Sequence, residues 1–568
     1  MKTLRRLCLA LVLLALMVPS ISKAQWVQTN GPYSGNVSRL AFGGTTVFVG
    51  SSNGVFRSVN NGGSWIGARS GLMNRNVYSL AAGGTSIFAG KKRQPYKEDP
   101  RLFSNLAANP RTILLEDTLL YDMYGNLLDD NPAYNEKAPL WGPVVGVIGT
   151  NTFTSLLDTY VLKSSFTRVG FVSWGRNLRA GWSWGDGWEW DRDRFGMNFF
   201  MHPYSGSAFF NSARANGYTF WESAPFVLLG SYMWKIFGET VKPERNDLII
   251  TTVDGIFLGE ILYRLSSNLL DDRTTGAERF FRELGAAVLC PTRFASRLLQ
   301  GNLSRATSEE VYQKGPLNIT LSAGVRKVND RTSFGTGSTD AMFNVHLDYG
   351  NPFERRSRKV FDYFKLRTDF SFGVGRKVLD NVTGYGILFG KNVQYGNLEM
   401  LVGGFQHYDF FDNKTFEIGT VAFGPGIISK LPLSTSANLF STIHLGIVPF
   451  GGDNMAFGPD TSQFRDYNYG GGLEGKLETT LNLGSWVDVT FVGYYWWIHT
   501  YVGEAGDHYI ALIKPSIAVR LLKDLSIGFE HLVYYSDRYP SDAPSIHFVR
   551  TEQRIFLQLY FEAFQFEQ

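Results

Sequence analysis

The stretch FKLRTDFSFGV, residues 364–374, decides the fold class of this chain. Apolar residues or threonine stand at every second position, and charged or polar residues fill most of the positions between them. Successive side chains of a β-strand point to opposite faces, so this segment has one oily face and one wet face. The same alternation returns in LEGKLETTLNL, residues 473–483. Both segments predict antiparallel strands with one apolar surface.

From about Leu317 to Phe566 the sequence holds about twelve such segments, separated by turn signals such as Asn351-Pro352. A closed transmembrane barrel requires lipid outside, a polar lumen inside, an even number of strands and no free edge. The 61 glycines and the aromatic content of 15% suit tight turns and interfacial girdles. We therefore expect a mainly β protein with an antiparallel outer-membrane-type β-barrel over residues 315–568. A soluble β-sandwich alternates in the same way and is the alternative.

The N-terminus predicts a secretory signal peptide, residues 1–24. It has a basic start from Lys2 to Arg6, an apolar core over 7–18, and the small residues Ser22 and Ala24 before the cut. Together with the barrel, it predicts the outer membrane of a Gram-negative-type bacterium. The expected partners are membrane lipids and the outer-membrane assembly machinery. The net charge of +4 is spread along the chain, so we expect no nucleic-acid partner.

Two related segments follow, NVSRLAFGGTTVFVG at 36–50 and NVYSLAAGGTSIFAG at 76–90. Between them lies a match to the Asp-box pattern, with Asn in place of Asp, formed by Ser58, Asn60, Gly62 and Trp65. The segment resembles the Asp-box propellers of sialidases and photosystem assembly factors, in which this motif stabilises a turn. Propellers use four to eight blades, so residues 25–92 predict a short propeller-like repeat module without a catalytic role. Residues 93–140 are charged and rich in Pro and Asn, which predicts a linker.

The region 141–305 has a different character and predicts a helical domain. Its apolar or helically spaced stretches are Val144–Leu162, Ala224–Phe237, Asp247–Leu265 and Ala277–Leu289. We expect these helices to pack on one another, on the membrane surface or against the barrel. In the last stretch, Arg279, Arg282 and Glu283 are expected on the wet side. The barrel would leave a narrow lumen, which the helical domain could plug or line.

The densest polar and aromatic block extends from Asn177 to Asn216, and polar and aromatic residues continue to Ser223. This region contains the pieces NLRAGWSW, the HPYSG core at 202–206 and FNSARANGYTFWESAP. With NDLIITTVDGIFLGEILYRLSS further on, these pieces resemble the uncharacterised bacterial family named domain of unknown function 3943. The resemblance is best over residues 177–272 and extends loosely over about 140–568. It implies an envelope location and no established reaction.

Two hypotheses cover the chemistry of this block. In the enzymatic one, His202 is the general acid or base, Ser205 or Ser207 on a glycine-containing turn is the nucleophile, and Glu222 or Asp254 orients the imidazole. The binding residues for a lipid phosphate or an oxyanion would be Asn198, Asn211, Arg214 and Asn216. The activity would be that of a membrane lipid-modifying hydrolase or acyltransferase.

In the structural hypothesis, His202 caps a turn, Asn198 and Asn211 bond loop backbone, and Arg214 pairs with Glu222 or Glu239. The tryptophans then form an interfacial belt. This hypothesis predicts a structural, binding or transport-related envelope protein, and whether the chain is an enzyme stays open. We expect no cofactor and no metal, because His202 has no nearby His or Cys partner and Cys290 is the only cysteine outside the signal.

Overall fold

The computed structural model divides the chain into two units, Met1–Arg111 and Thr112–Gln568. The residues that it describes are 37–43, 46–51, 54–60, 64–67, 79–83, 86–90, 113–114, 120–121 and 137–561, the last with gaps at 183–186, 191–192, 309, 355–357, 374–376, 414, 416, 455–466 and 485. The expected signal peptide lies outside the described residues, as does most of the expected linker. The aromatic residues at the end of the chain, Phe564 and Phe566, lie outside them too.

The first unit contains short antiparallel strands. Four of them pair in chain order: β1 (Val37–Gly43), β2 (Thr46–Ser51), β3 (Gly54–Ser58) and β4 (Ile66–Gly67). Strands β5 (Ser79–Gly83) and β6 (Ser86–Gly90) form a separate pair. The Asn60 side-chain oxygen accepts a hydrogen bond of 2.9 Å from the Ser64 backbone N–H, which is the local contact that a turn brace requires. The propeller-like module itself stays a prediction.

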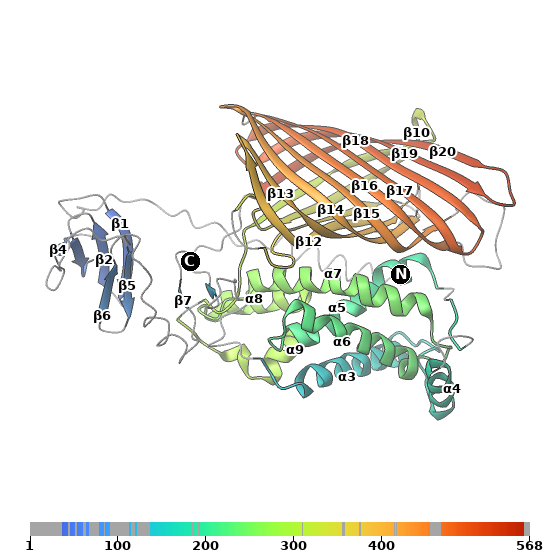
Figure 1. Cartoon of the computed structure of the whole chain (residues 1–568), viewed down its shortest axis with the longest axis horizontal. Helices are drawn as coiled ribbons and strands as arrows, with labels where there is room; N and C mark the ends of the chain where they lie inside the picture. The colour runs from blue at the N-terminus through green and yellow to red at the C-terminus, as the bar shows by residue number, and fades with distance from the viewer. Residues whose placement is uncertain are drawn as a thin grey trace. The chain divides into compact units, whose positions relative to one another are not determined.

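The second unit contains a closed antiparallel barrel of twelve strands, which confirms the predicted fold (Figure 1). In chain order the strands are β9 (Leu317–Asp330), β10 (Ser333–Tyr349), β11 (Phe364–Phe372), β12 (Leu379–Tyr395), β13 (Leu398–Asp412), β14 (Glu417–Ser434), β15 (Ala437–Asn454), β16 (Tyr467–Leu483), β17 (Val487–Val502), β18 (Gly506–Leu522), β19 (Leu525–Pro540) and β20 (Ile546–Phe561). Each pairs with its neighbour in sequence, and β20 pairs with β9 to close the ring. The short β7 (Ile113–Leu114) and β8 (Leu120–Tyr121) pair with each other outside the barrel.

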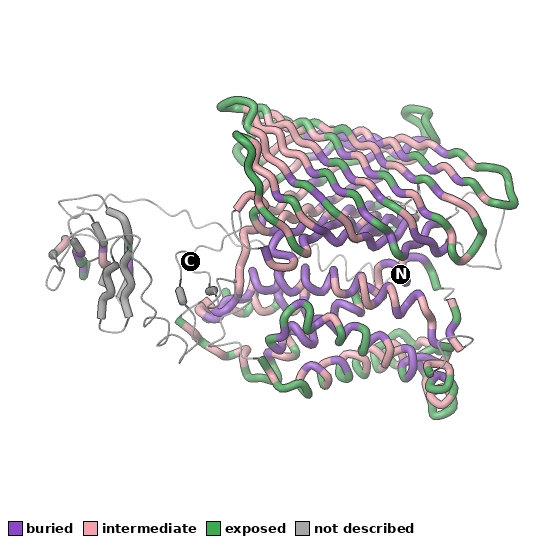
Figure 2. The backbone as a smooth tube through the Cα atoms, viewed as in Figure 1, coloured by how far each residue is buried: buried purple, intermediate pink, exposed green. Residues whose placement is uncertain are grey.

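The two faces of the barrel wall differ as the alternation predicts. On β16, Leu473 and Leu477 are exposed on the outer face, while Glu474, Lys476 and Glu478 are buried on the inner face. Exposed apolar side chains recur over most of the outer wall, where Figure 2 shows alternating bands of burial. An apolar exterior around a polar interior is the arrangement of an outer-membrane-type barrel.

Side chains cross the lumen of the barrel. The Arg367 guanidinium on β11 donates to both oxygens of Glu478 on β16, at 2.6 and 2.9 Å. It also donates to the Tyr494 hydroxyl on β17, at 3.0 Å. Strands six steps apart in a ring of twelve lie opposite one another, so β11 and β17 face each other across the lumen. Lys476 makes a second bridge, with its Nζ 2.7 Å from Asp409 Oδ2 on β13.

The region before the barrel is helical. Its elements are α3 (Trp141–Leu156), η1 (Leu157–Val161), α4 (Phe171–Trp182), η2 (Met197–Met201), α5 (His202–Arg214), α6 (Phe220–Met233), η3 (Trp234–Gly238), α7 (Arg245–Leu269), α8 (Gly276–Leu289), α9 (Pro291–Leu299) and η4 (Asn302–Ser304). The four helical stretches expected from the sequence are confirmed, and α4, α5 and α9 are additional. No helix in the described part of the chain combines the length and the apolar content that a membrane crossing needs.

The helices pack against the outer wall of the barrel, with α7 closest to it (Figure 1). The Phe257 ring of α7 stacks on Tyr408 of β13, with centroids 5.6 Å apart. The amide of Gln406 on the same strand donates to the Val253 carbonyl, at 3.1 Å. Gln406 and Tyr408 alternate with His407 and so share the outward face. The expectation that the helical domain plugs or lines the lumen is therefore wrong, because the barrel's own side chains cross that space.

Helices α5 and α7 meet at two glycines. A Cβ added at Gly206 would lie 2.0 Å from the Thr251 carbonyl oxygen and 2.9 Å from Gly255 Cα. A Cβ at Gly255 would lie 2.6 Å from Gly206 Cα, so only glycine allows this backbone contact. The glycine-containing turn expected around Ser205 is thus wrong. Gly206 lies inside a helix, where it permits close helix packing instead of a turn.

Candidate functional site

A pocket of about 1550 Å³ lies among α3, α5 and α9, and most of its lining is apolar. Six of the residues singled out in the sequence line it, namely His202, Ser205, Ser207, Asn211, Arg214 and Asn216. Asn198, Glu222 and Asp254 are not among the lining residues. The polar block of the sequence therefore does mark a site, but only in part.

Helix α5 sets the length of the pocket. It begins at His202 and ends at Arg214, and both of these residues line the pocket. The helix has 13 residues, so twelve steps of 1.5 Å separate its first and last residues by about 18 Å. The pocket therefore has a histidine end and an arginine end, with an apolar section between them that includes Ala208 and Phe209.

At the histidine end, His202 Nε2 lies 3.1 Å from Asp247 Oδ2. Burial disfavours the charged imidazole, but the neighbouring Asp247 carboxylate outweighs burial and raises the pKa of His202 above its ordinary value. Burial alone would raise the pKa of Asp247, yet His202 and Lys235 hold it below its usual range. The half-buried His202 and the buried Asp247 thus form a close pair at the first turn of α7.

Lys235 lies beside this pair among three carboxylates. Its Nζ lies 2.8 Å from Glu239 Oε2 and 2.7 Å from Glu244 Oε2, and it also contacts Asp247. The carboxylates of Glu239, Glu244 and Asp247 are close enough together to share a metal ion. The Lys235 ammonium contacts all three, and these carboxylates raise its pKa despite burial. The cation that this acidic group surrounds is therefore a lysine.

The carboxylates expected to orient His202 lie elsewhere. Glu222 forms a capping box with Thr219 at the start of α6, and its exposed carboxylate lies 2.7 Å from Lys137 Nζ. The hydrogen bond from Lys137 lowers the pKa of Glu222. Asp254 is buried on α7, and burial raises its pKa well above the ordinary value. The carboxylate next to His202 is therefore that of Asp247, and not that of Glu222 or Asp254 as predicted from the sequence.

The expected nucleophiles are not activated by His202. The Ser207 hydroxyl donates to the Tyr204 carbonyl of its own helix, at 2.6 Å. Within the described part of the chain, no hydrogen bond joins Ser205 to His202. These contacts give no support to the lipid-modifying hydrolase.

The asparagines hold the fold together. The Asn198 amide donates to the hydroxyls of Tyr467 and Tyr469 on the outer barrel wall, at 2.5 and 3.2 Å. The Asn211 amide donates to the Ser207 carbonyl and, at 3.1 Å, to the Gly259 carbonyl of α7. Asn216 closes the end of α5 by donating to the Ser212 carbonyl and accepting from Gln300.

Arg214 pairs with a residue that the sequence analysis did not consider. Its guanidinium forms two bonds to Glu260 on α7, at 2.8 and 3.0 Å, so the expected pairing with Glu222 or Glu239 is wrong. Arg264 also binds Glu260, at 2.8 Å. All three side chains are buried. Helical periodicity could have indicated the pair of Glu260 and Arg264, which are four residues apart on α7, but not the long-range pair with Arg214.

Helices α8 and α9 direct charged side chains into the protein and leave apolar side chains exposed. Arg279 and Glu283 of α8 face a polar cluster within the protein, while Phe280 and Phe281 are about 60% exposed. On α9 the Arg293 side chain is buried, and Leu299 is 82% exposed. The prediction that Arg279 and Glu283 lie on the solvent-facing side of α8 is therefore wrong. The amphipathic pattern gives the helix but cannot tell which face meets water and which meets another apolar phase.

The tryptophans do not share one environment. Trp182 at the end of α4 is 92% exposed, whereas Trp188 is buried. Trp190 stacks on Phe450 of the barrel wall, with centroids 6.0 Å apart. Among the described tryptophans of residues 177–223, Trp182 and Trp221 are exposed as an interfacial belt requires.

The family resemblance is confirmed over the site. Residues 187–292 match the family described as Domain of unknown function (DUF3943). That segment contains α5, α6, α7 and α8 and the first residues of α9. No curated protein matches the sequence.

Several solved outer-membrane proteins are similar to the barrel at low identity. OmpT of Vibrio cholerae is 9% identical, with 44% of this chain and 97% of that chain covered and a TM-score of 0.22. The NanC porin is 11% identical, with 42% and 98% covered and a TM-score of 0.24. The channel DcaP of Acinetobacter baumannii is 7% identical, with 44% and 97% covered and a TM-score of 0.22. The fold assignment rests on the closed ring of twelve strands itself.

Proposed function

We propose that this protein binds lipid in the pocket of its helical domain, and that the barrel serves as the anchor that holds this domain in the outer membrane. In this proposal residues 1–24 direct secretion, the outer-membrane assembly machinery inserts the barrel, and membrane lipids are the ligands. The role is thus a binding role in the envelope. The hydrolase alternative is not carried further.

One observation carries the proposal, namely that the helices around the pocket expose their apolar side chains. The pocket-lining residues Trp141 and Phe153 on α3 and Leu299 on α9 are 69%, 68% and 82% exposed. Exposed apolar surface of this extent marks an interaction site on a protein surface. Because the helical domain packs on the same outer wall that presents apolar side chains to lipid, acyl chains are the apolar phase that these residues meet.

Ion pairs between the described strands cross the barrel lumen and occupy part of its space. Arg367, Glu478 and Tyr494 bridge opposite strands there, and Asp409 and Lys476 form a second bridge. A ligand would have to displace these matched charges, whereas the pocket of the helical domain is already open. This contrast favours binding in the helical domain over transport through the lumen.

The test fills the pocket by one substitution. A Cβ at Gly149, which lines the pocket, meets no atom within 4 Å, so Gly149→Trp adds an indole there without a backbone clash. Gly175 on α4 is open in the same way but does not line the pocket, so Gly175→Trp is the matched control.

Binding of a fluorescent acyl lipid to the full-length protein in detergent is measured for wild type and both variants. We expect saturable binding by wild type and Gly175→Trp, and a loss of at least about tenfold in affinity, or about 1.4 kcal/mol, for Gly149→Trp. Equal binding by all three proteins, or none by wild type, contradicts the proposal.

A further inference from the structure

Helix α8 presents an apolar face that is separate from the pocket. Phe280, Phe281 and Leu284 are exposed large apolar side chains, and Ala277 before them is exposed as well. Residues three and four apart share one side of a helix, so these four form a single stripe, which we call the α8 face. None of these four described residues lines the pocket. The α8 face is therefore a second surface that needs a partner.

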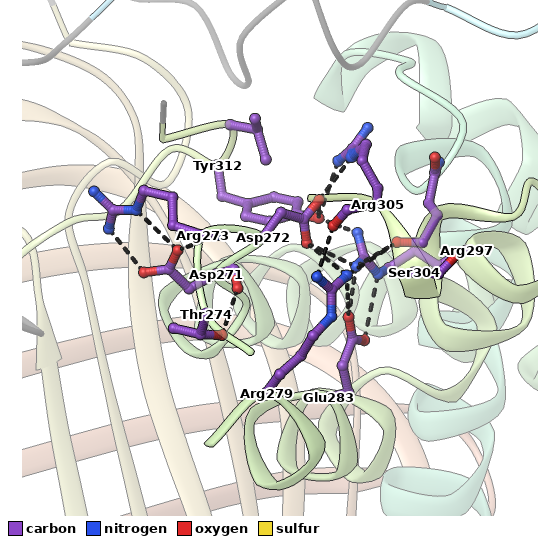
Figure 3. Close-up of polar contacts among 12 residues, drawn as sticks. Asp271, Asp272, Arg273, Thr274, Arg279, Glu283, Arg297, Ser304, Arg305 and Tyr312 are labelled. Carbon is purple, nitrogen blue, oxygen red and sulfur yellow. Dashed lines mark hydrogen bonds and ion pairs between the residues drawn. The ribbon is translucent and has the colours of Figure 1, made fainter. Parts of the chain in front are cut away.

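The opposite side of α8 is charged and turned into the protein, as Figure 3 shows for Arg279 and Glu283. Glu283 lies 2.5 Å from Arg297 of α9, and Arg279 lies 3.7 Å from Asp272. The third charged residue of this side, Arg282, donates to the carbonyl of the last residue of α7, at 3.3 Å. A surface helix of a soluble protein directs its apolar stripe to the core and its charges to water. Helix α8 does the reverse, so its outer face suits an apolar medium.

Helix α8 begins where α7 meets the first barrel strand. The Asn268 amide near the end of α7 donates to the Gly315 carbonyl, at 2.9 Å, and the Asn268 side-chain oxygen accepts from the Gly315 N–H, at 3.1 Å. Lys314 Nζ lies 3.2 Å from Oδ2 of Asp271, which stands between α7 and α8 in the chain. Because β9 begins two residues after Gly315, these contacts hold the start of α8 beside the end of the barrel where β9 begins.

The barrel at this end is the periplasmic one and presents an apolar wall. Strand β20, which pairs with β9, exposes Ile555, Leu557 and Leu559 on its outer face. Four of the five hairpins that join described strands at the end where β9 begins have turns of two or three residues. In outer-membrane barrels the short turns are periplasmic and the longer loops are extracellular. Helix α8 is therefore held next to a lipid-facing wall, at the periplasmic side.

We propose that the α8 face inserts into the periplasmic leaflet of the outer membrane, with Phe280, Phe281 and Leu284 among the lipid acyl chains. This inference goes beyond the proposed lipid binding, because it concerns the surroundings of the helical domain and requires no ligand in the pocket. An interfacial amphipathic helix buries its apolar side chains about 5–10 Å deep at the boundary of head groups and acyl chains. Arg279 and Glu283 keep their partners within the protein, so insertion exposes neither charge to lipid.

The first experiment measures the depth of the α8 face by fluorescence quenching. Phe281→Cys, in a full-length chain with Cys8→Ser and Cys290→Ser, is labelled with bimane and placed in phosphatidylcholine vesicles whose acyl chains carry bromine. Glu278→Cys is the matched control, because Glu278 is exposed on the same helix but lies outside the stripe, 2.8 Å from Arg282. Leu557→Cys on β20 is the reference for a lipid-facing position. Heat-modifiable gel mobility reports whether each labelled protein is folded.

We expect quenching at Phe281→Cys within about twofold of that at Leu557→Cys, and at least about twofold weaker quenching at Glu278→Cys. Bromine near the head groups is expected to quench Phe281→Cys more than bromine near the chain ends. Quenching at Phe281→Cys that is no stronger than at Glu278→Cys overturns the proposal. If neither bromolipid nor aqueous iodide quenches Phe281→Cys, another protein surface or a second copy covers the face, and the lipid assignment is wrong.

A second experiment tests which leaflet the α8 face enters. A maleimide polymer too large for porins is added to intact cells that carry Glu278→Cys or Ser541→Cys, where Ser541 follows β19 at the opposite end of the barrel. We expect labelling of Ser541→Cys in intact cells, and of Glu278→Cys only after the outer membrane is permeabilised. Labelling of Glu278→Cys in intact cells overturns the periplasmic placement. Neither experiment depends on the pocket that Gly149→Trp fills, so the two proposals can fail separately.

Discussion

The barrel lumen and the pocket of the helical domain are both lined by charged side chains, but they differ in how the charges are matched. In the lumen, Arg367 meets Glu478 and Lys476 meets Asp409 from strands on different sides of the ring. At the arginine end of the pocket, acids such as Glu260 and Asp272 are each shared among arginines. Matched charges that cross a space hold it shut, whereas the pocket of the helical domain keeps an open and mostly apolar section beside its arginines. A barrel fold therefore does not by itself locate the site of function.

The substitution with the largest expected effect disrupts the packing of the helical domain and leaves the barrel folded. Gly255→Leu puts a side chain where α5 and α7 are in backbone contact, and overpacking at such a contact costs about 3 kcal/mol or more. We expect the helical signal in circular dichroism to fall while heat-modifiable gel mobility persists. Gly149→Ala, at an open position, is the control. A Gly255→Leu protein with a wild-type melting temperature argues against the close contact.

The next effect concerns the matched charges of the lumen. Glu478→Ala leaves the half-buried Arg367 without its carboxylate, and we expect a cost below the about 3–5 kcal/mol of a fully buried pair. We expect a lower midpoint of guanidinium unfolding for the single variant. The double variant Arg367→Met/Glu478→Met is expected to recover most of this loss and to raise the single-channel conductance in planar bilayers. Unchanged conductance of the double variant would mean that these residues do not close the lumen.

A smaller effect concerns pH at the histidine end. Because Asp247 raises the pKa of His202, the stability from this pair is fully present below about pH 6.5, the unfolded pKa, and is lost as the pH rises through the higher folded value. We expect histidine nuclear magnetic resonance to give His202 a pKa above 6.5. Asp247→Asn should lower that pKa and make the melting temperature less dependent on pH between pH 6 and 8. A His202 pKa at or below 6.5 in wild type contradicts the pairing.

The smallest expected effect is a gain in stability. Burial raises the pKa of Asp254, so its ionisation opposes folding and its contribution to stability falls as the pH rises above the unfolded value. Asp254→Asn keeps the shape and removes the charge. We expect a gain in the free energy of unfolding at neutral pH and a smaller gain at pH 4. Differential scanning calorimetry at the two pH values measures this, and a loss of stability at neutral pH contradicts it.

The sequence predicts the barrel well because each strand carries its own evidence. In LEGKLETTLNL the period of two alone separates Leu473 from Glu474, and closure follows from the need to satisfy strand edges in lipid. The helices α3, α6, α7 and α8 are also predictable, since long apolar or periodic stretches mark them. Helix α5 is not, because Pro203 and Gly206 are usual turn residues.

The site is only partly predictable, for a physical reason. The polar block points to His202 and Arg214, but their partners Asp247 and Glu260 lie on another helix at long sequence separation. A local pattern carries no information on such pairs. The sequence also does not predict that the apolar face of α8 points outward, because the amphipathic pattern is the same whether that face meets the protein core or lipid. Arg293 and Arg297 appear ordinary until the fold places them beside Tyr312.

The central claim is that ligand binds in the helical domain and not in the lumen. The most direct test is native mass spectrometry of lipid bound to the full-length protein, for wild type, Gly149→Trp and Arg367→Met/Glu478→Met. We predict lipid on wild type and on the lumen variant, and its loss from Gly149→Trp alone. Retention of lipid by Gly149→Trp together with its loss from the lumen variant would contradict the account.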